Sequence, residues 1–204
     1  MVEFQNAFKA YGEKTILEDF SYSFTDAGLY AITGASGKGK TTFLRLISHL
    51  EALDRGTIKS PKRIAYSFQE YRLFPNLTVR DNIELIAFEK NSDIDKESVD
   101  WYLKKLSLID EADKYPDELS GGMKQRVSLI RAFACQATVL LLDEPTKELD
   151  NTLASMVVEI IQEIAKTKLV IVSLHSEDFA KEIGAKIITT QKSLSHFEPN
   201  KSHK

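Results

Sequence analysis

Apolar and polar residues alternate near the start of the chain, as they do in strands with one buried face. Phe20, Tyr22 and Phe24 are separated by serines, so we expect a half-buried strand there. The short apolar run Leu29–Thr33 predicts a second strand, and Arg63–Phe68 predicts a third. This part of the chain is therefore expected to be rich in β-structure.

Two further segments place their apolar residues at the spacing of one helix face. Thr41–Leu50 predicts a helix directly after a glycine-rich segment. From about Asn76 to Lys114 the pattern is helical and glycine is absent, with Thr78 and Asp81 spaced much as in a capping box. One buried face of this stretch is expected to carry Val99, Tyr102, Leu103 and Leu106. We interpret the stretch as a small helical insertion in an α/β protein.

Strands and helices alternate in the last part of the chain. The continuous apolar runs Val139–Leu142 and Leu169–Leu174 predict strands buried on both faces. The helices expected between and after them bury, respectively, Leu153, Met156, Val157, Ile160, Ile161 and Ile164, and Phe179, Ala180 and Ile183. Lys186–Thr190 predicts a closing strand. The alternation predicts an α/β fold with a parallel sheet covered on both sides.

Composition narrows the class of protein. With 204 residues, of which 43% are apolar and 28% charged, the chain has the profile of a globular protein. Its net charge of −3 argues against a surface devoted to nucleic acid. Cys135 is the single cysteine, so no internal disulfide is expected. Met1–Ala10 lacks the apolar core of a targeting signal, and no apolar run approaches the roughly 20 residues that cross a bilayer.

A glycine-rich loop lies between the strand expected at Leu29–Thr33 and the helix that follows it. It satisfies the pattern G-x-x-x-x-G-K-[ST], in which glycines let several backbone N–H groups converge on one phosphate. Lys40 is expected to reach the β- and γ-phosphates of a nucleotide, and the Thr41 hydroxyl to bind Mg²⁺. The residues expected around the phosphates are Gly34, Ala35, Ser36, Gly37, Lys38, Gly39, Lys40, Thr41 and Thr42.

Two carboxylates follow the predicted strand Val139–Leu142. Asp143 lies at the C-terminal end of this strand, where ligands bind in open α/β sheets, and is expected to hold Mg²⁺ through water. Glu144 follows immediately and is suited to orient and polarise an attacking water. Taken alone, the pair could be two solvated carboxylates at a strand end. Beside a phosphate loop, the catalytic interpretation is favoured.

The segment LSGGMKQR, Leu119–Arg126, predicts a second glycine-rich helix start. Ser120 can cap the helix, and the two glycines after it permit a close approach of backbone. Lys124 and Arg126 lie in the first turn, where the helix dipole disfavours cations by about 0.3–1 kcal/mol. This placement suits a helix that faces a phosphate held by another molecule. An ordinary serine-capped helix is the alternative.

With these motifs the chain resembles the ATP-binding cassette (ABC) ATPases. Gly34–Thr42 is similar to their Walker A segment and LSGGM to their LSGGQ signature. FQEYRLFPNLTVRDN resembles their Q-loop, KELD their D-loop, and VSLHSED the segment of their switch histidine. Order and spacing match over nearly the whole chain. The resemblance implies a single domain over residues 1–204, a P-loop NTPase with a mainly parallel core sheet, an N-terminal antiparallel β-subdomain and a helical subdomain at about 76–118.

Several roles follow from the resemblance, position by position. Tyr11 is placed like the aromatic residue that stacks on adenine, with a plain strand tyrosine as the alternative. Gln69 is similar to the residue that senses Mg²⁺ and the attacking water, and His175 to the group at the γ-phosphate. Together with Lys40 and Glu144, these two residues are implied to be catalytic.

The resemblance also implies a working dimer that closes around two ATP molecules. Each ATP would lie between the phosphate loop of one chain and Ser120, Gly121 and Gly122 of the other. Asp150 would belong to the contact between the two cassettes, which are either identical or similar chains. The implied metal ligands are Thr41, Gln69 and Asp143.

The implied function is that of the ATP-hydrolysing subunit of a bacterial ABC transporter, at the cytoplasmic face of the cell membrane. Integral-membrane permease subunits and an external substrate-binding protein are the expected partners, and nucleic acid is not. Met123 replaces the usual glutamine, as in importer cassettes resembling nitrate, sulfonate and taurine transporters, so an importer is expected. Lys38, Lys147 and Glu148 also depart from the family pattern. The alternative is a soluble ABC-type ATPase that acts on DNA or ribosomes.

The permease is expected to dock near Gln69–Asn82. The apolar and aromatic residues expected to receive it are Tyr71, Leu73, Phe74 and Pro75. An ordinary core between two parts of the chain is the alternative explanation for this cluster.

Overall fold

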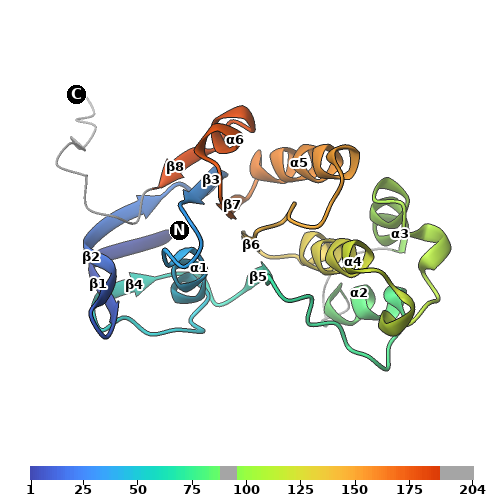
Figure 1. The fold of residues 1–204 in the computed structure, drawn as a ribbon, viewed down its shortest axis with the longest axis horizontal. Coiled ribbons are helices and arrows are strands. Elements are labelled where there is room, and N and C mark those ends of the chain that lie inside the picture. The colour runs from blue at the N-terminus through green and yellow to red at the C-terminus, as the bar shows by residue number, and fades with distance from the viewer. Residues whose placement is uncertain (88–95, 189–204) are drawn as a thin grey trace.

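The computed structural model describes residues 1–87 and 96–188, whose strands form two separate sheets. The strands are β1 (Val2–Tyr11), β2 (Lys14–Phe24), β3 (Gly28–Thr33), β4 (Arg55–Lys59), β5 (Ile64–Ser67), β6 (Val139–Asp143), β7 (Leu169–Leu174) and β8 (Lys186–Ile188). The helices are α1 (Lys40–Ile47), α2 (Val79–Ala87), α3 (Lys96–Lys105), α4 (Gly121–Ala134), α5 (Asn151–Ala165) and α6 (Glu177–Glu182), with the short 3₁₀ helices η1 (Ile109–Glu111) and η2 (Pro116–Glu118). Figure 1 shows β1, β2 and β4 at one end of the molecule and α2, α3 and α4 at the other.

The smaller sheet is antiparallel, with the strand order β2-β1-β4. Val2 pairs with Phe24, so β1 and β2 form a long hairpin. On its inner face, the rings of Phe4 and Phe20 pack on the ring of Phe43 in α1, with centroids 5.0 and 5.6 Å apart. Offset and edge-on ring pairs of this kind add to the energy of apolar burial. The alternation that predicted β2 is confirmed.

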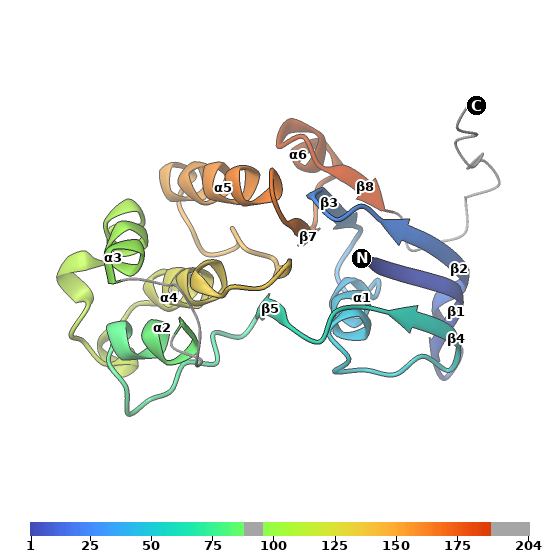
Figure 2. The same ribbon diagram turned by 180° about the vertical axis from the view of Figure 1, so that it is seen from behind.

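The larger sheet is parallel, with the strand order β5-β6-β7-β3-β8. All residues of β6 and β7 are buried, because layers cover both faces of the sheet, as the apolar runs predicted. Leu140 and Val172 belong to the core shared with α4 and α5, whereas Leu141 and Ile171 belong to the core shared with α1 and the smaller sheet. Figure 2 shows α1 between the two sheets from behind.

Two predicted boundaries differ from the structure. The helix predicted to reach Leu50 ends at Ile47, since His49 adopts a left-handed backbone with φ of 58°. Leu50 is therefore not on a buried helix face and is 57% exposed. The closing strand β8 covers Lys186–Ile188, and the last two residues of its predicted range, Thr189 and Thr190, lie outside the described residues.

The predicted helical stretch contains α2, α3 and the short 3₁₀ helix η1, and η2 follows just after it. The N–H of Asp81 donates to Oγ1 of Thr78 at 3.1 Å, so the threonine caps the start of α2. The face predicted to be buried is confirmed for Val99, Leu103 and Leu106, which are fully buried. Tyr102 is partly buried against the same core.

Arg126 of α4 points into the helical layer and joins α4 to the end of α3. Its side chain is buried, and Nη1 donates to the carbonyl oxygens of Leu106 at 2.6 Å and Ser107 at 3.2 Å, just beyond the end of α3. Its Nε donates to the carbonyl of Gly122. Burial lowers the pKa of the guanidinium. These donors satisfy backbone carbonyls that a helix end leaves unpaired, so the Arg126 guanidinium has a structural role within the chain.

Replacing Arg126 by methionine should therefore destabilise the fold. Removal of the guanidinium leaves buried carbonyl groups without donors, which costs about 1–3 kcal/mol in the free energy of unfolding. Urea titration should show a lower midpoint at an unchanged m-value. The matched control is Lys104→Met on the exposed side of α3, expected to change stability by no more than about 0.5 kcal/mol. Equal stability of both variants would contradict the prediction.

Candidate functional site

Parallel pairing brings the ends of three strands to one edge of the larger sheet. Thr33, the last residue of β3, pairs with Leu174 of β7, and Asp143, the last residue of β6, pairs with Ser173 of β7. The chain then continues from β3 into the glycine-rich loop, from β6 to Glu144, and from β7 into the segment with the predicted histidine. Ligand sites of open α/β sheets lie at this carboxyl edge.

The glycine-rich loop needs glycine because of its backbone conformation and, at one position, because of a close neighbour. Gly34, Gly37 and Gly39 all have positive φ values, of 143°, 73° and 92°, a region that side chains with a Cβ rarely adopt. At Gly39, a Cβ would also lie 2.5 Å from a methyl carbon of Ile16 in β2. The residues between, from Ala35 to Lys38, are exposed. The loop therefore presents its backbone to solvent at the start of α1.

Lys40 points back over this loop from the first turn of α1. Its side chain is 5% exposed, and Nζ donates to the carbonyl of Gly34 at 2.8 Å and of Ala35 at 3.3 Å. Nζ also lies 4.0 Å from Oε1 of Glu144. A buried ammonium held by carbonyl oxygens at a helix start is arranged to receive an anion.

A second lysine, which the sequence did not single out, contacts the same loop. Nζ of Lys14 in β2 donates to the carbonyl of Gly37. Its place two residues before Ile16 on the hairpin strand could have drawn attention to it only once the hairpin was known to lie beside the loop.

Asp143 is buried and is oriented by one hydroxyl group. Oγ of Ser173 donates to Oδ1 of Asp143 at 2.6 Å, whereas Oδ2 is buried and has no hydrogen-bond partner among the described residues. The phenol of Tyr66 titrates above its ordinary pKa, because it is buried and because the Asp143 carboxylate lies close by. Ser173 lies within an apolar strand, and no pattern in the sequence signals its role.

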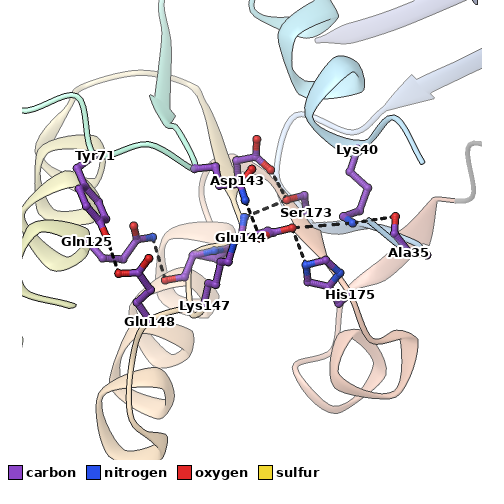
Figure 3. Close-up of polar contacts among 12 residues, drawn as sticks. Ala35, Lys40, Tyr71, Gln125, Asp143, Glu144, Lys147, Glu148, Ser173 and His175 are labelled. Carbon is purple, nitrogen blue, oxygen red and sulfur yellow. Dashed lines mark hydrogen bonds and ion pairs between the residues drawn. The ribbon is translucent and has the colours of Figure 1, made fainter. Parts of the chain in front are cut away.

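Glu144 gathers most of the predicted catalytic residues around its carboxylate (Figure 3). Nε2 of His175 lies 2.6 Å from Oε1 of Glu144, and Nζ of Lys40 lies 4.0 Å from the same oxygen. Nε2 of Gln69 donates to Oε2 at 3.3 Å. Nζ of Lys147, which the sequence analysis noted only as a departure, also lies 3.3 Å from Oε2. Charged and polar groups from four separate segments thus converge on one carboxylate.

The backbone of Glu144 is itself unusual. Its φ of 52° places a residue with a Cβ in the left-handed region, at a cost of about 1–3 kcal/mol that the surroundings must offset. Its N–H donates to Oγ of Ser173 at 2.9 Å. The same serine hydroxyl therefore fixes both Asp143 and Glu144.

The second glycine-rich helix start has the predicted serine cap, and its two glycines lie against Glu148. Oγ of Ser120 accepts from the N–H of Met123 at 3.3 Å, and α4 begins at Gly121. A Cβ on Gly121 would lie 2.7 Å from Oε2 of Glu148, and one on Gly122 would lie 2.9 Å from the carbonyl oxygen of Glu148. Within the described residues, no hydrogen bond or ion pair joins this helix start to the loop Gly34–Thr42.

Contacts from two sides hold the segment that resembles the D-loop and the residues just before it, as Figure 3 shows. The Tyr71 hydroxyl donates to Oε2 of Glu148, and buried Gln125 donates to the carbonyl of Pro145 at 3.5 Å. Asp150 caps α5 by accepting from the N–H of Leu153 at 2.9 Å. Its side chain therefore already has a local structural role.

Tyr11 lies at the end of β1, apart from the cluster around Glu144. Its ring is 47% exposed, and Nζ of Lys9 lies 4.9 Å from its centroid. An exposed ring at the end of a strand is available to stack on a planar group.

The relatives of the chain agree with this site. A family model described as ABC transporter matches residues 17–147, well over half of the chain. The chain is 33% identical to the glutamine transport ATP-binding protein GlnQ of Bacillus subtilis, a match over 92% of this chain and 86% of that protein. It is 36% identical to the L-cystine import ATP-binding protein TcyN of the same organism, over 92% and 81%.

Solved structures give the same result at the level of the fold. The ATP-binding cassette MJ0796, solved as a dimer in a post-hydrolysis state bound to ADP and Pi, matches with a TM-score of 0.82. The two sequences are 27% identical, and the match covers 94% of each chain. Together with the phosphate loop and the cluster around Glu144, these findings show that the chain belongs to the ABC transporter family, as one of its ATPase cassettes.

Proposed function

We propose that the chain is the ATP-hydrolysing subunit of a bacterial importer for amino acids. The observation that carries the hydrolytic part is the convergence of Lys40, Gln69 and His175 on Glu144 beside a phosphate loop. A carboxylate in this position can orient and polarise the water that attacks the γ-phosphate. For the substrate class, the names of the glutamine and L-cystine relatives support amino acids over the nitrate, sulfonate or taurine that Met123 suggested.

In this proposal, ATP lies along the carboxyl edge of the larger sheet. The loop Gly34–Thr42 binds its phosphates through backbone N–H groups, and Nζ of Lys40 turns from the loop carbonyls to the β- and γ-phosphates. The half-exposed ring of Tyr11 stacks on adenine. Glu144 orients the attacking water. His175, whose Nε2 lies 2.6 Å from Oε1 of Glu144, contacts the γ-phosphate.

The same edge of the sheet fits Mg²⁺. Oδ2 of Asp143 is buried and unpaired among the described residues, which suits an oxygen that accepts from a metal-bound water. We propose that the Thr41 hydroxyl and the Gln69 amide oxygen would bind the metal directly, and that Asp143 would hold it through water. Mg²⁺ prefers such oxygen ligands and usually keeps waters and substrate phosphates in its remaining positions. When bound, it neutralises charge on the β- and γ-phosphate oxygens.

The second helix start completes the site from another molecule. We propose that Ser120, Gly121 and Gly122 of one cassette bind the γ-phosphate held by the other, with Asp150 at the contact between them. The dimeric state of the MJ0796 cassette supports a second ATPase subunit. Closure would exclude water and complete the electrostatic surroundings of the phosphate, and loss of the γ-phosphate would let the pair open.

Glu144→Gln tests hydrolysis and the dimer together. The amide keeps the shape of the side chain but removes the base, so ATP turnover should fall by about a hundredfold or more. With Mg²⁺ and ATP, the variant should accumulate as a dimer, as measured by size-exclusion chromatography with light scattering. The control, Glu159→Gln, changes an exposed partner of Lys105 and should do neither. Undiminished turnover, or no dimer with ATP, would show that this mechanism is wrong.

Asp143→Asn tests the metal site by binding alone. The neutral amide keeps a hydrogen bond to Ser173 but attracts Mg²⁺ less, so the affinity of the ATP complex for Mg²⁺ should fall about tenfold to a hundredfold. Calorimetric titration of ATP with and without Mg²⁺ measures this difference. Asp110→Asn, an exposed carboxylate of η1, serves as the control. If Mg²⁺ strengthens ATP binding equally in all three proteins, Asp143 is not a metal ligand.

The surface proposed for the permease is a groove of about 430 Å³ next to the Q-loop. Leu50 and Phe74 line it and are 57% and 46% exposed, whereas Arg72 and Arg131 supply positive charge. Two residues expected at this surface are engaged elsewhere, because Tyr71 bonds to Glu148 and Leu73 packs on the core. We propose that an apolar segment of the permease fills this groove, and that Phe74 is the main contact.

Phe74→Ser should weaken association with the membrane subunits. Loss of an exposed aromatic contact leaves the fold intact but removes apolar area from the interface. The measurement is the recovery of integral-membrane permease subunits with tagged protein from detergent-solubilised membranes. Tyr115→Ser is the matched control, since Tyr115 is also 46% exposed but lies outside the groove. Equal recovery with both variants would remove Phe74 from the interface.

The remaining parts of the proposal concern organisation and location. Within residues 1–87 and 96–188, no helix has the length and apolarity needed to span a membrane. We propose that the permease holds the cassette at the cytoplasmic face of the membrane, and that an external substrate-binding protein delivers the amino acid. Residues 1–204 would form one cassette, with 76–118 as its helical subdomain. The names of the relatives lend no support to the alternative of a soluble ATPase on DNA or ribosomes.

A further inference from the structure

Lys9 of β1 is a buried cation outside the phosphate loop and the cluster around Glu144. The residue is only 6% exposed. Its Nζ lies 2.9 Å from Oε1 of Glu51 and 3.3 Å from Oδ1 of Asp54, both in the segment that follows α1. Burial of an ammonium is costly unless carboxylates compensate for the lost water, and here two of them do.

Backbone hydrogen bonds reinforce this link between β1 and the segment after α1. Oδ2 of Asp54 accepts from the N–H of Ala10 at 2.8 Å, and the N–H of Asp54 donates to the carbonyl of Phe8 at 3.0 Å. The end of β1 is thereby fixed to a segment only a few residues beyond the last turn of α1. Because α1 begins at Lys40, one helix joins this contact to the phosphate loop.

The same ammonium faces the ring of Tyr11, two positions further along β1. Nζ lies 4.9 Å from the ring centroid, within the range of a cation–π contact. The Lys9 ammonium beside it holds the pKa of the Glu51 carboxyl below its ordinary value. The ring remains 47% exposed, so these contacts fix it without covering it. Lys9, itself held by Glu51, thus contacts an aromatic side chain at the end of a strand.

We propose that Lys9 is a positioning residue for the nucleotide base: it holds Tyr11 where the ring can stack on adenine while the phosphates occupy the loop Gly34–Thr42. This rests on the proposed function. The contacts of Lys9 set the distance between a stacking surface and a phosphate loop through α1. A side chain that acts in this way contributes to the binding of the base and not to the binding of the phosphates.

Lys9→Met separates these two contributions. The measurement is calorimetric binding of ATP and of inorganic tripolyphosphate, each with Mg²⁺, to the full chain. ATP should bind about threefold to tenfold more weakly to the variant, whereas the affinity for tripolyphosphate should stay unchanged. Unchanged tripolyphosphate binding also shows that the phosphate loop of the variant is folded. Lys9→Arg keeps both the cation and its carboxylate partners, and should retain most of the affinity for ATP.

Two further variants make the outcomes distinct. Lys59→Met removes an exposed lysine from the same sheet, where it pairs with Glu3, and should change neither affinity. Tyr11→Ala should reproduce the selective loss of ATP binding. A Lys9→Met protein that binds ATP normally, or that loses both ligands equally, overturns the inference and leaves the proposed function intact. Failure of the unaltered chain to bind ATP would contradict the proposed function itself.

Discussion

The hydroxyl of Ser173 is the contact on which the arrangement of the site depends. It donates to Asp143 and accepts from the N–H of Glu144, so one atom fixes two successive carboxylates. This requires β6 and β7 to be paired in parallel with Asp143 opposite Ser173. It also helps to hold Glu144 in a left-handed backbone conformation, which turns its carboxylate toward Lys40 and His175. A shift of one residue in the register of β6 and β7 would send the side chains of Asp143 and Ser173 to opposite faces of the sheet.

The two glycine-rich helix starts need glycine for different physical reasons. At Gly39 the backbone has a positive φ, and a side chain would also clash with Ile16 of the neighbouring strand. At Gly122 the limitation is space, because the backbone carbonyl oxygen of Glu148 would lie 2.9 Å from a Cβ, whereas at Gly121 the close atom is the movable end of the Glu148 side chain. The signature segment is therefore shaped by packing inside one chain as well as by the phosphate that we propose it meets in a dimer.

Side chains connect the site to the surfaces proposed for other ligands and partners. Arg131 of α4 donates to the carbonyl groups of Tyr71 and Arg72, which fastens the segment beside the groove to the helix that starts with the signature. On the other side, Lys9 ties the end of β1 to the segment after α1. The sites proposed for the phosphates, the base and the membrane partner would therefore be linked to one another through contacts within the chain.

The sequence alone predicted most of the strands and helices, and many of the residue types of the site. Apolar runs predicted β6 and β7 because a strand covered on both faces needs no polar residues, and spacing identified the loop around Lys40 and the carboxylates Asp143 and Glu144. Their roles in ATP hydrolysis remain proposals. Only the tertiary structure showed that Ser173 orients both carboxylates, that Lys147 joins the charges on Glu144, and that Arg126 closes a helix end. The contacts of Ser173 and Arg126 join residues far apart in the chain and follow from strand register and helix packing, whereas the Lys147 contact is local and depends on the backbone turn at Glu144.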